Sequence, residues 1–238
     1  MSALLKINDL WGGYTEGVDI LRGISMEVQQ GDAVGIIGLN GSGKSTFGKA
    51  IMNMIPIRRG EILLDGEDIT ALSTSQLAHR GISIMQQGGR VFPNLSVWDN
   101  LQLAAHGNNS QSSILKSQIA GLVPLLQQSK KELQHLMADK LSGGQKHQLS
   151  LAMTLATNPC FIILDEPSAG LSPIAAVDMY QILHTIREKL KVSLILIEQN
   201  IAMATEFCDK TLLLQQGSFK GETNKKDIQS IELLMFSK

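Results

Sequence analysis

The pattern of apolar and polar positions divides the chain into short strands and helices that alternate. Mostly apolar runs at 33–37, 161–164 and 192–197, the second of them uninterrupted, are typical of strands buried in a parallel sheet. The following elements are expected after them: helices at 47–54, 173–190 and 201–207, and a last strand at 211–214. Because strands and helices alternate, the chain is predicted to have an α/β fold with a central, mainly parallel sheet.

The pattern differs in two parts of the chain. Near the N-terminus, segments 3–10, 21–28 and 61–66 are expected to be strands of a separate antiparallel subdomain. Between residues 96 and 140, apolar positions recur at helical spacing: Leu115, Ile119, Leu122, Leu126 and Leu133. We therefore expect one domain, 1–238, in which 1–95 and 158–238 form the core with its antiparallel subdomain and 96–157 forms a helical insertion.

Composition limits the classes of function. The 238 residues are 43% apolar, which is enough for the core of one large domain, and the formal net charge is −1. A basic surface for nucleic acid is therefore not expected. Neither a membrane-spanning run nor a leader is apparent, so we expect a cytoplasmic protein. The two cysteines, Cys160 and Cys208, are too few for a disulfide scaffold and are expected to be buried.

The segment from Gly38 to Thr46 carries the strongest chemical signal. Its G-x-x-x-x-G-K-S pattern lies between a predicted strand and a predicted helix, which is the context of a phosphate-binding loop. Glycines allow backbone N–H groups to face phosphate oxygens, and the helix directs its positive end at them. Lys44 is expected to reach the β- and γ-phosphates and the Ser45 hydroxyl to bind Mg²⁺. The candidate nucleotide-binding residues of this loop are Gly38, Asn40, Gly41, Ser42, Gly43, Lys44, Ser45 and Thr46.

Two carboxylates follow the apolar run at 161–164. Asp165 and Glu166 are expected at the carboxyl edge of the sheet, where open α/β sheets bind ligands. Asp165 is suited to hold Mg²⁺, and Glu166 to act as the general base for the water that attacks the γ-phosphate. Alone, such a pair is more often a solvated turn; together with the phosphate loop, the functional interpretation is favoured.

The pentapeptide Leu-Ser-Gly-Gly-Gln at 141–145 opens another predicted helix. Ser142, Gly143, Gly144 and Gln145 offer a hydroxyl and free N–H groups at a positive helix end. A single nucleotide does not need two phosphate-binding surfaces, so this one is expected to serve a nucleotide held by another subunit. The alternative is an ordinary helix cap.

These three motifs, in this order and with a helical insertion before the second, resemble the ATP-binding subunits of ABC transporters over nearly the whole chain. The LSGGQ pentapeptide is highly specific for that family. The resemblance implies a P-loop NTPase core, ATP and Mg²⁺ as cofactors, and a head-to-tail dimer. Each ATP would lie between the phosphate loop of one subunit and the LSGGQ segment of the other.

The resemblance also implies roles for further residues. Tyr14 matches the aromatic residue that stacks on adenine. Gln87 matches the glutamine that contacts Mg²⁺ and the attacking water, although Gln86 leaves the register open by one residue. Residues 168–172 match the loop at the dimer contact. Gln199 replaces the histidine that commonly contacts the γ-phosphate; because its amide donates a hydrogen bond but cannot take up a proton or become charged near neutral pH, a slower site is left open.

Residues 81–97 and 166–173 are similar to the branched-chain amino acid uptake ATPases and to the related urea and amide importers. This similarity implies an importer subunit on the inner face of the membrane. Its partners would be a second ATPase subunit, identical or paralogous, a membrane permease and, indirectly, a periplasmic or extracellular solute-binding protein. A non-transport ABC ATPase, a weakly hydrolysing regulatory subunit and an exporter subunit are the alternatives. His147, after the LSGGQ segment, is expected to be solvated.

Overall fold

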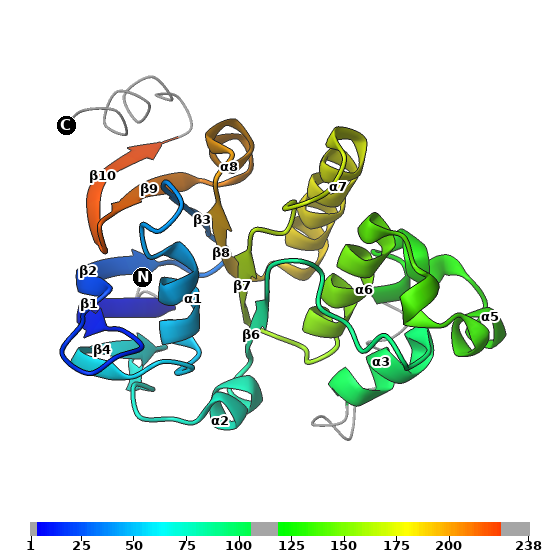
Figure 1. The fold of residues 1–238 in the computed structure, drawn as a ribbon, viewed down its shortest axis with the longest axis horizontal. Coiled ribbons are helices and arrows are strands. Elements are labelled where there is room, and N and C mark those ends of the chain that lie inside the picture. The colour runs from blue at the N-terminus through cyan, green and yellow to red at the C-terminus, as the bar shows by residue number, and fades with distance from the viewer. Residues whose placement is uncertain (1–3, 106–118, 225–238) are drawn as a thin grey trace. The chain divides into compact units, whose positions relative to one another are not determined.

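The computed structural model describes residues 4–105 and 119–224. By their contacts the residues form two compact units. Unit 1 comprises 1–77, 163–165 and 192–238, and unit 2 comprises 78–162 and 166–191, in each case as far as the chain is described. Figure 1 shows the elements of both.

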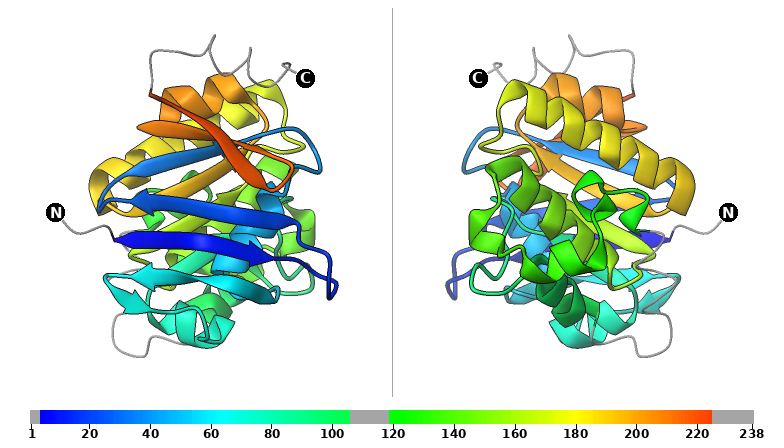
Figure 2. Two further views of the ribbon diagram at one scale, coloured as in Figure 1. Left: turned by 90° about the vertical axis from the view of Figure 1, so that its left-hand side faces the viewer. Right: turned by 90° about the vertical axis from the view of Figure 1, so that its right-hand side faces the viewer.

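The first sheet of unit 1 is antiparallel and contains four strands in the order β2, β1, β4, β5. These are β2 (Leu21–Val28), β1 (Leu5–Gly12), β4 (Ile57–Leu64) and β5 (Glu67–Asp68). Leu5 of β1 lies opposite Val28 on one side and Leu64 on the other. Leu5, Ile7 and Leu10 are buried, whereas Lys6 is half-buried, as expected for strands with one face on the core. The predicted antiparallel subdomain is confirmed (Figure 2, left).

The second sheet of unit 1 is mixed, with the strand order β10, β9, β3, β8, β7. Its strands are β10 (Ser218–Asn224), β9 (Lys210–Gln215), β3 (Ala33–Ile37), β8 (Ser193–Glu198) and β7 (Phe161–Asp165), the last of which enters unit 1 at residue 163. β3 runs parallel to β8 and to β9, and β10 is antiparallel to β9. Every residue of β3 and β8 is buried, which explains why both strands are mainly apolar. The predicted mainly parallel sheet is confirmed.

Two helices pack on this sheet within unit 1. Helix α1 (Lys44–Ile51) contacts β8, and α8 (Ile201–Phe207) contacts β3, β8 and β9. Their aromatic residues Phe47 and Phe207 are fully buried. Phe47 also meets Phe219 of β10 edge to face, with ring centroids 5.9 Å apart. These contacts hold the helix that follows the phosphate loop against the sheet.

Unit 2 contains most of the helices. They are α3 (Val97–Ala105), α5 (Lys130–His135), α6 (Gly143–Leu155) and α7 (Pro173–Leu190), with short 3₁₀ turns at Pro124–Gln127 and Ala138–Lys140. Helix α6 packs on α3, on α7 and on strand β6 (Ile82–Met85) (Figure 2, right). β6 lies beside the start of β7, where Cys160 N–H and Phe161 N–H both donate to Gly81 O. A further helix, α2 (Thr74–His79), crosses the boundary between the units.

The apolar residues that recur at helical spacing between residues 96 and 140 are buried in unit 2 wherever the structure describes them. Leu122, Leu126 and Leu133 are buried, and Leu115 lies outside the described residues. The contact-defined unit 2 is larger than the predicted insertion 96–157, because it also contains β6 and α7. The predicted division of the chain into a core and an insertion at 96–157 therefore stays a prediction. None of the helices in the described ranges has the length and apolar character needed to cross a bilayer.

Phe207→Ala is expected to lower the free energy of unfolding by about 3–5 kcal/mol, since a buried ring is lost and a cavity remains. The Phe207 side chain is 1% exposed, whereas Phe92, at 49%, provides the matched control. Phe92→Ala is expected to change the free energy by less than about 0.5 kcal/mol. Urea unfolding followed by circular dichroism measures both. Equal effects would contradict the packing of α8 described here.

Candidate active site

The phosphate loop, residues 38–46, connects β3 to α1 in unit 1. Gly41 and Gly43 have φ angles of 79° and 107°, which side-chain-bearing residues rarely adopt. A Cβ atom at Gly38 would lie 2.3 Å from the carbonyl oxygen of Leu214. Glycine is therefore required at these positions by the backbone itself. Unlike α6, α7 and α8, helix α1 has no side-chain cap on its first N–H groups.

The polar groups of this loop face inward. Lys44 is 5% exposed, and its Nζ donates to Gly38 O at 2.9 Å and to Leu39 O at 3.1 Å. Ser42 Oγ is buried, and no hydrogen-bond partner for it exists among the described residues. A buried hydroxyl without a partner, an ammonium group and an uncapped helix start together form a site for an anion such as phosphate.

A hydroxyl and a carboxylate meet beside the loop. Ser45, in the first turn of α1, donates through Oγ to Asp165 Oδ1 at 3.0 Å. Asp165 ends β7 and is 4% exposed. Hydroxyl and carboxylate oxygens are ligands that Mg²⁺ accepts, so this pair fits the predicted metal site.

Gln87 and Glu166 meet within unit 2. Gln87 Nε2 donates to Glu166 Oε2 at 2.6 Å, between residues 79 positions apart in the sequence. Glu166 is 6% exposed and has a φ of 48°, a left-handed conformation that is strained for a non-glycine residue. This contact favours Gln87 over Gln86 for the predicted role. The strained, buried carboxylate has the environment of a residue held for chemistry.

The LSGGQ segment forms the start of α6 in unit 2. Ser142 is the N-cap: its hydroxyl accepts from Gln145 N–H at 3.3 Å, and Gln145 Oε1 accepts from Ser142 N–H at 2.9 Å. This capping box is the ordinary helix cap considered as the alternative. Gly143 and Gly144 have no Cβ to cover the remaining N–H groups of the first turn, so the cap and a phosphate-facing surface are compatible.

Tyr14 and Gln199 belong to unit 1. Tyr14 is 52% exposed, its hydroxyl accepts from Lys49 Nζ at 3.3 Å, and that ammonium lies 5.5 Å from the ring centroid. Gln199 follows β8, and its backbone N–H donates to Glu198 Oε2 at 3.1 Å. An exposed ring is available for stacking on a base. The sequence did not point to Lys49, and no pattern along the chain identifies it.

Two expectations about burial were wrong. His147 was expected in solvent but is 5% exposed: its Nδ1 is 3.0 Å from Gly143 O, and it packs on Gly89. Its Nε2 has no partner among the described residues. Cys160 was expected to be buried but is exposed, whereas Cys208 is buried as predicted.

The structure thus groups the predicted residues in two sets. Unit 1 holds the phosphate loop, Asp165, Tyr14 and Gln199; unit 2 holds Gln87, Glu166 and the LSGGQ segment. The first set offers groups suited to the phosphates of a nucleoside triphosphate and to a metal, and the second contains a paired carboxylate and amide.

Comparison with known proteins identifies the class. The family model for ABC transporters matches residues 21–169, and the chain belongs to this family. It is an ATP-binding subunit of the ABC type and an ATP hydrolase.

Particular relatives fall in two groups. The chain is 32% identical to the probable branched-chain amino acid transport protein LivF of Archaeoglobus fulgidus over 93% of both chains. It is 31% identical to the lipopolysaccharide export protein LptB of Escherichia coli, over 90% of this chain and 88% of that protein. The branched-chain amino acid transport protein BraG of Pseudomonas aeruginosa is 30% identical, over 86% of each.

Solved structures agree on the fold. The ATP-binding subunit of an ABC transporter superposes with a TM-score of 0.80 at 27% identity, covering 98% of this chain and 95% of that one. CbiO1 of Clostridium perfringens, part of the transporter complex cbiONQ, gives 0.83 at 24% identity, covering 98% and 93%. Because its sequence identity is only 24%, the similarity to CbiO1 supports the fold alone.

Lys44→Ala is expected to weaken ATP binding at least about tenfold, because a charge-assisted contact to the phosphates is lost. Isothermal titration calorimetry measures the affinity. Lys140→Ala is the control, since the Lys140 side chain is 74% exposed and pairs with its neighbour Asp139. Unchanged ATP affinity in Lys44→Ala would contradict the assignment of the phosphate loop.

Proposed function

We propose that this chain hydrolyses ATP in a head-to-tail dimer and thereby drives the uptake of branched-chain amino acids, or a related small solute, through a membrane permease. It would lie on the inner face of the membrane, with a solute-binding protein delivering the solute to the permease. The observation that supports the proposed solute is the likeness to LivF, a probable branched-chain amino acid transport protein, over 93% of both chains.

The residues of unit 1 bind the nucleotide in this proposal. Lys44 and the N–H groups of the loop hold the phosphates, and the Ser42 hydroxyl gains the partner that it lacks. Tyr14 stacks on adenine. Ser45 and Asp165 would hold Mg²⁺, and Gln87 is the further ligand that the family resemblance implies; the ion, when bound, would neutralise phosphate charge. The LSGGQ segment of the second subunit binds the same nucleotide.

Glu166 takes the proton from the attacking water. The water oxygen forms a bond to the γ-phosphorus, the bond from that phosphorus to the β-phosphate oxygen breaks, and ADP and inorganic phosphate result. Gln87, which donates to Glu166 Oε2, orients the carboxylate towards the water. Gln199 takes the place of the histidine that the family commonly has at the γ-phosphate, and its amide donates a hydrogen bond without carrying charge.

Export is the second candidate, because LptB is 31% identical to the chain over a nearly equal length. The two candidates differ in the cargo rather than in the ATPase chemistry. The residues of the site are the same for both, and fold alone does not imply the cargo.

Deleting the gene in its own host is expected to reduce the uptake of labelled leucine, isoleucine or valine at least about tenfold, because an importer without its ATPase has no driving force. Re-expression of the wild type should restore uptake, and Lys44→Ala should not. Unchanged uptake of these solutes together with a loss of lipid from the cell surface would contradict import and favour export.

Glu166→Gln is expected to lower steady-state ATP hydrolysis by at least about a hundredfold, because the amide cannot accept the proton from water. ATP binding should persist, so an ATP-dependent dimer is expected to accumulate. Phosphate release and light scattering measure the two effects. Glu206→Gln, on the exposed face of α8, is the matched control. Full turnover in Glu166→Gln would remove this residue from the role of base.

A further inference from the structure

The loop that carries Tyr14 has little packing of its own. We call residues 13–20, between β1 and β2, the adenine loop; residues 14–18 within it are all exposed. An exposed loop of this kind is ordered by hydrogen bonds rather than by an apolar core. Apart from the contact of Lys49 with its hydroxyl and ring, the position of Tyr14 therefore depends on the residues that hold the loop.

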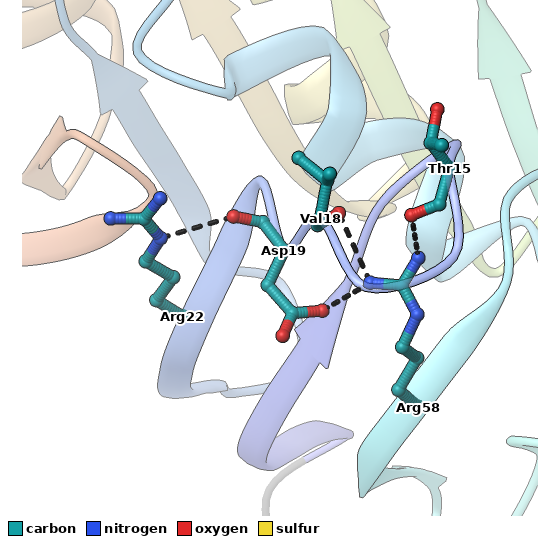
Figure 3. A network of polar contacts seen from close by, with 5 residues as sticks. All are labelled: Thr15, Val18, Asp19, Arg22 and Arg58. Atoms are coloured by element: carbon teal, nitrogen blue, oxygen red, sulfur yellow. Dashed lines mark hydrogen bonds and ion pairs between the residues drawn. The ribbon is translucent and has the colours of Figure 1, made fainter.

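Arg58 of β4 provides one anchor, shown in Figure 3. Its guanidinium donates through Nη1 to Val18 O at 3.0 Å and to Asp19 Oδ1, and through Nη2 to Thr15 O. The same loop receives a hydrogen bond from Arg22, whose Nε donates to Asp19 O at 3.0 Å. One guanidinium thus spans the residues directly after Tyr14, which the rigid fork of arginine can do and a lysine ammonium cannot.

Gly217, in the turn between β9 and β10, provides the second anchor. Its carbonyl oxygen accepts from Arg22 N–H at 2.8 Å, just after the adenine loop, and its N–H donates to Ser42 O of the phosphate loop at 3.0 Å. Its φ is 81°, and a Cβ atom there would lie 1.8 Å from Ile20 O. A single glycine is therefore hydrogen-bonded to the phosphate loop and to the start of β2, directly after the adenine loop, all within unit 1.

We propose that Arg58 and Gly217 are positioning residues for ATP: Arg58 holds Tyr14 against the adenine ring, and Gly217 keeps the adenine loop at the correct distance from the phosphate loop. Neither residue touches the nucleotide. The proposal rests on the proposed function, because it requires ATP in this site with Tyr14 on its base. The proposal predicts two different binding defects. Loss of Arg58 should weaken recognition of the base, whereas a side chain at Gly217 should weaken recognition of the base and the phosphates together.

The first experiment compares ATP with inorganic tripolyphosphate, which lacks the base and sugar, by calorimetry in the presence of Mg²⁺. Arg58→Ala is expected to weaken the binding of ATP about fivefold or more. It should weaken the binding of tripolyphosphate less than about twofold. Its effect on hydrolysis should appear in KM rather than in kcat. Arg59→Ala is the matched control: Arg59 is the next residue of β4 but pairs with Asp9 and lies over Trp11 instead.

A double-mutant cycle separates positioning from a general loss of structure. If Arg58 acts through Tyr14, Arg58→Ala has little further effect on ATP affinity in a Tyr14→Ala background. An equal loss with and without Tyr14, or an equal loss for tripolyphosphate and ATP, overturns the role of Arg58. Arg58→Lys, which retains the charge beside Asp19 without the fork, is expected to lie between the wild type and Arg58→Ala.

Gly217→Ala is expected to weaken ATP and tripolyphosphate together, because the new Cβ displaces both loops. Gly66→Ala is its matched control: Gly66 follows β4 in a turn with a φ of 80° and has open space around its Cβ position. The backbone strain is then equal and only the contact with Ile20 differs. Equal binding losses in the two alanine variants overturn the link through Gly217.

Binding by the wild-type protein shows whether the proposed function or only the positioning proposal has failed. If it binds neither ATP nor tripolyphosphate, the proposed function fails and this proposal with it. If the wild type binds both, and Arg58→Ala and Gly217→Ala match their controls, only the positioning proposal fails. Thermal unfolding of each variant, measured alongside, shows that the folded protein was titrated.

Discussion

Parallel pairing of β3 with β8 is the constraint on which the rest of unit 1 depends. Ile37 lies opposite Glu198 at the end of this pairing, so the chain leaves both strands at the same edge of the sheet. The phosphate loop therefore begins at the edge where Gln199 also lies. Parallel strands need long crossovers, usually helices, and α1 follows the loop directly with its N-terminus beside it. One pattern of backbone hydrogen bonds thus brings the phosphate loop and Gln199 to one edge of the sheet.

Each unit buries ionisable side chains at its candidate functional residues. Lys44, Asp165 and Glu166 are each 6% exposed or less. Removing charge from water costs free energy unless polar partners replace the water. The carbonyls of the loop do this for Lys44, Ser45 does so for Asp165, and Gln87 for Glu166. The unpartnered Ser42 hydroxyl and the left-handed Glu166 are local costs that a bound nucleotide and its chemistry would explain.

Features that depend on a few neighbouring residues could be predicted from the sequence. The glycines of the phosphate loop, the cap at Ser142 and helix α7 are examples, because turn geometry, capping and apolar periodicity act over short distances. Strand β10 and helix α2 were missed. β10 reads Ser-Phe-Lys-Gly-Glu-Thr-Asn, a largely polar segment that is a strand because it pairs with β9. α2 buries only Leu77, so its periodicity is too weak to detect.

The sequence by itself determined the fold class, the family and the residue types available for chemistry, because these follow from local pattern and motif spacing. Only the tertiary structure decided which distant residues meet. Gln87 faces Glu166, Arg58 crosses to the carbonyl of Thr15, and His147 is covered by Gly89. Each of these contacts joins segments far apart along the chain. Their geometry depends on the packing of everything between them, which no local pattern encodes.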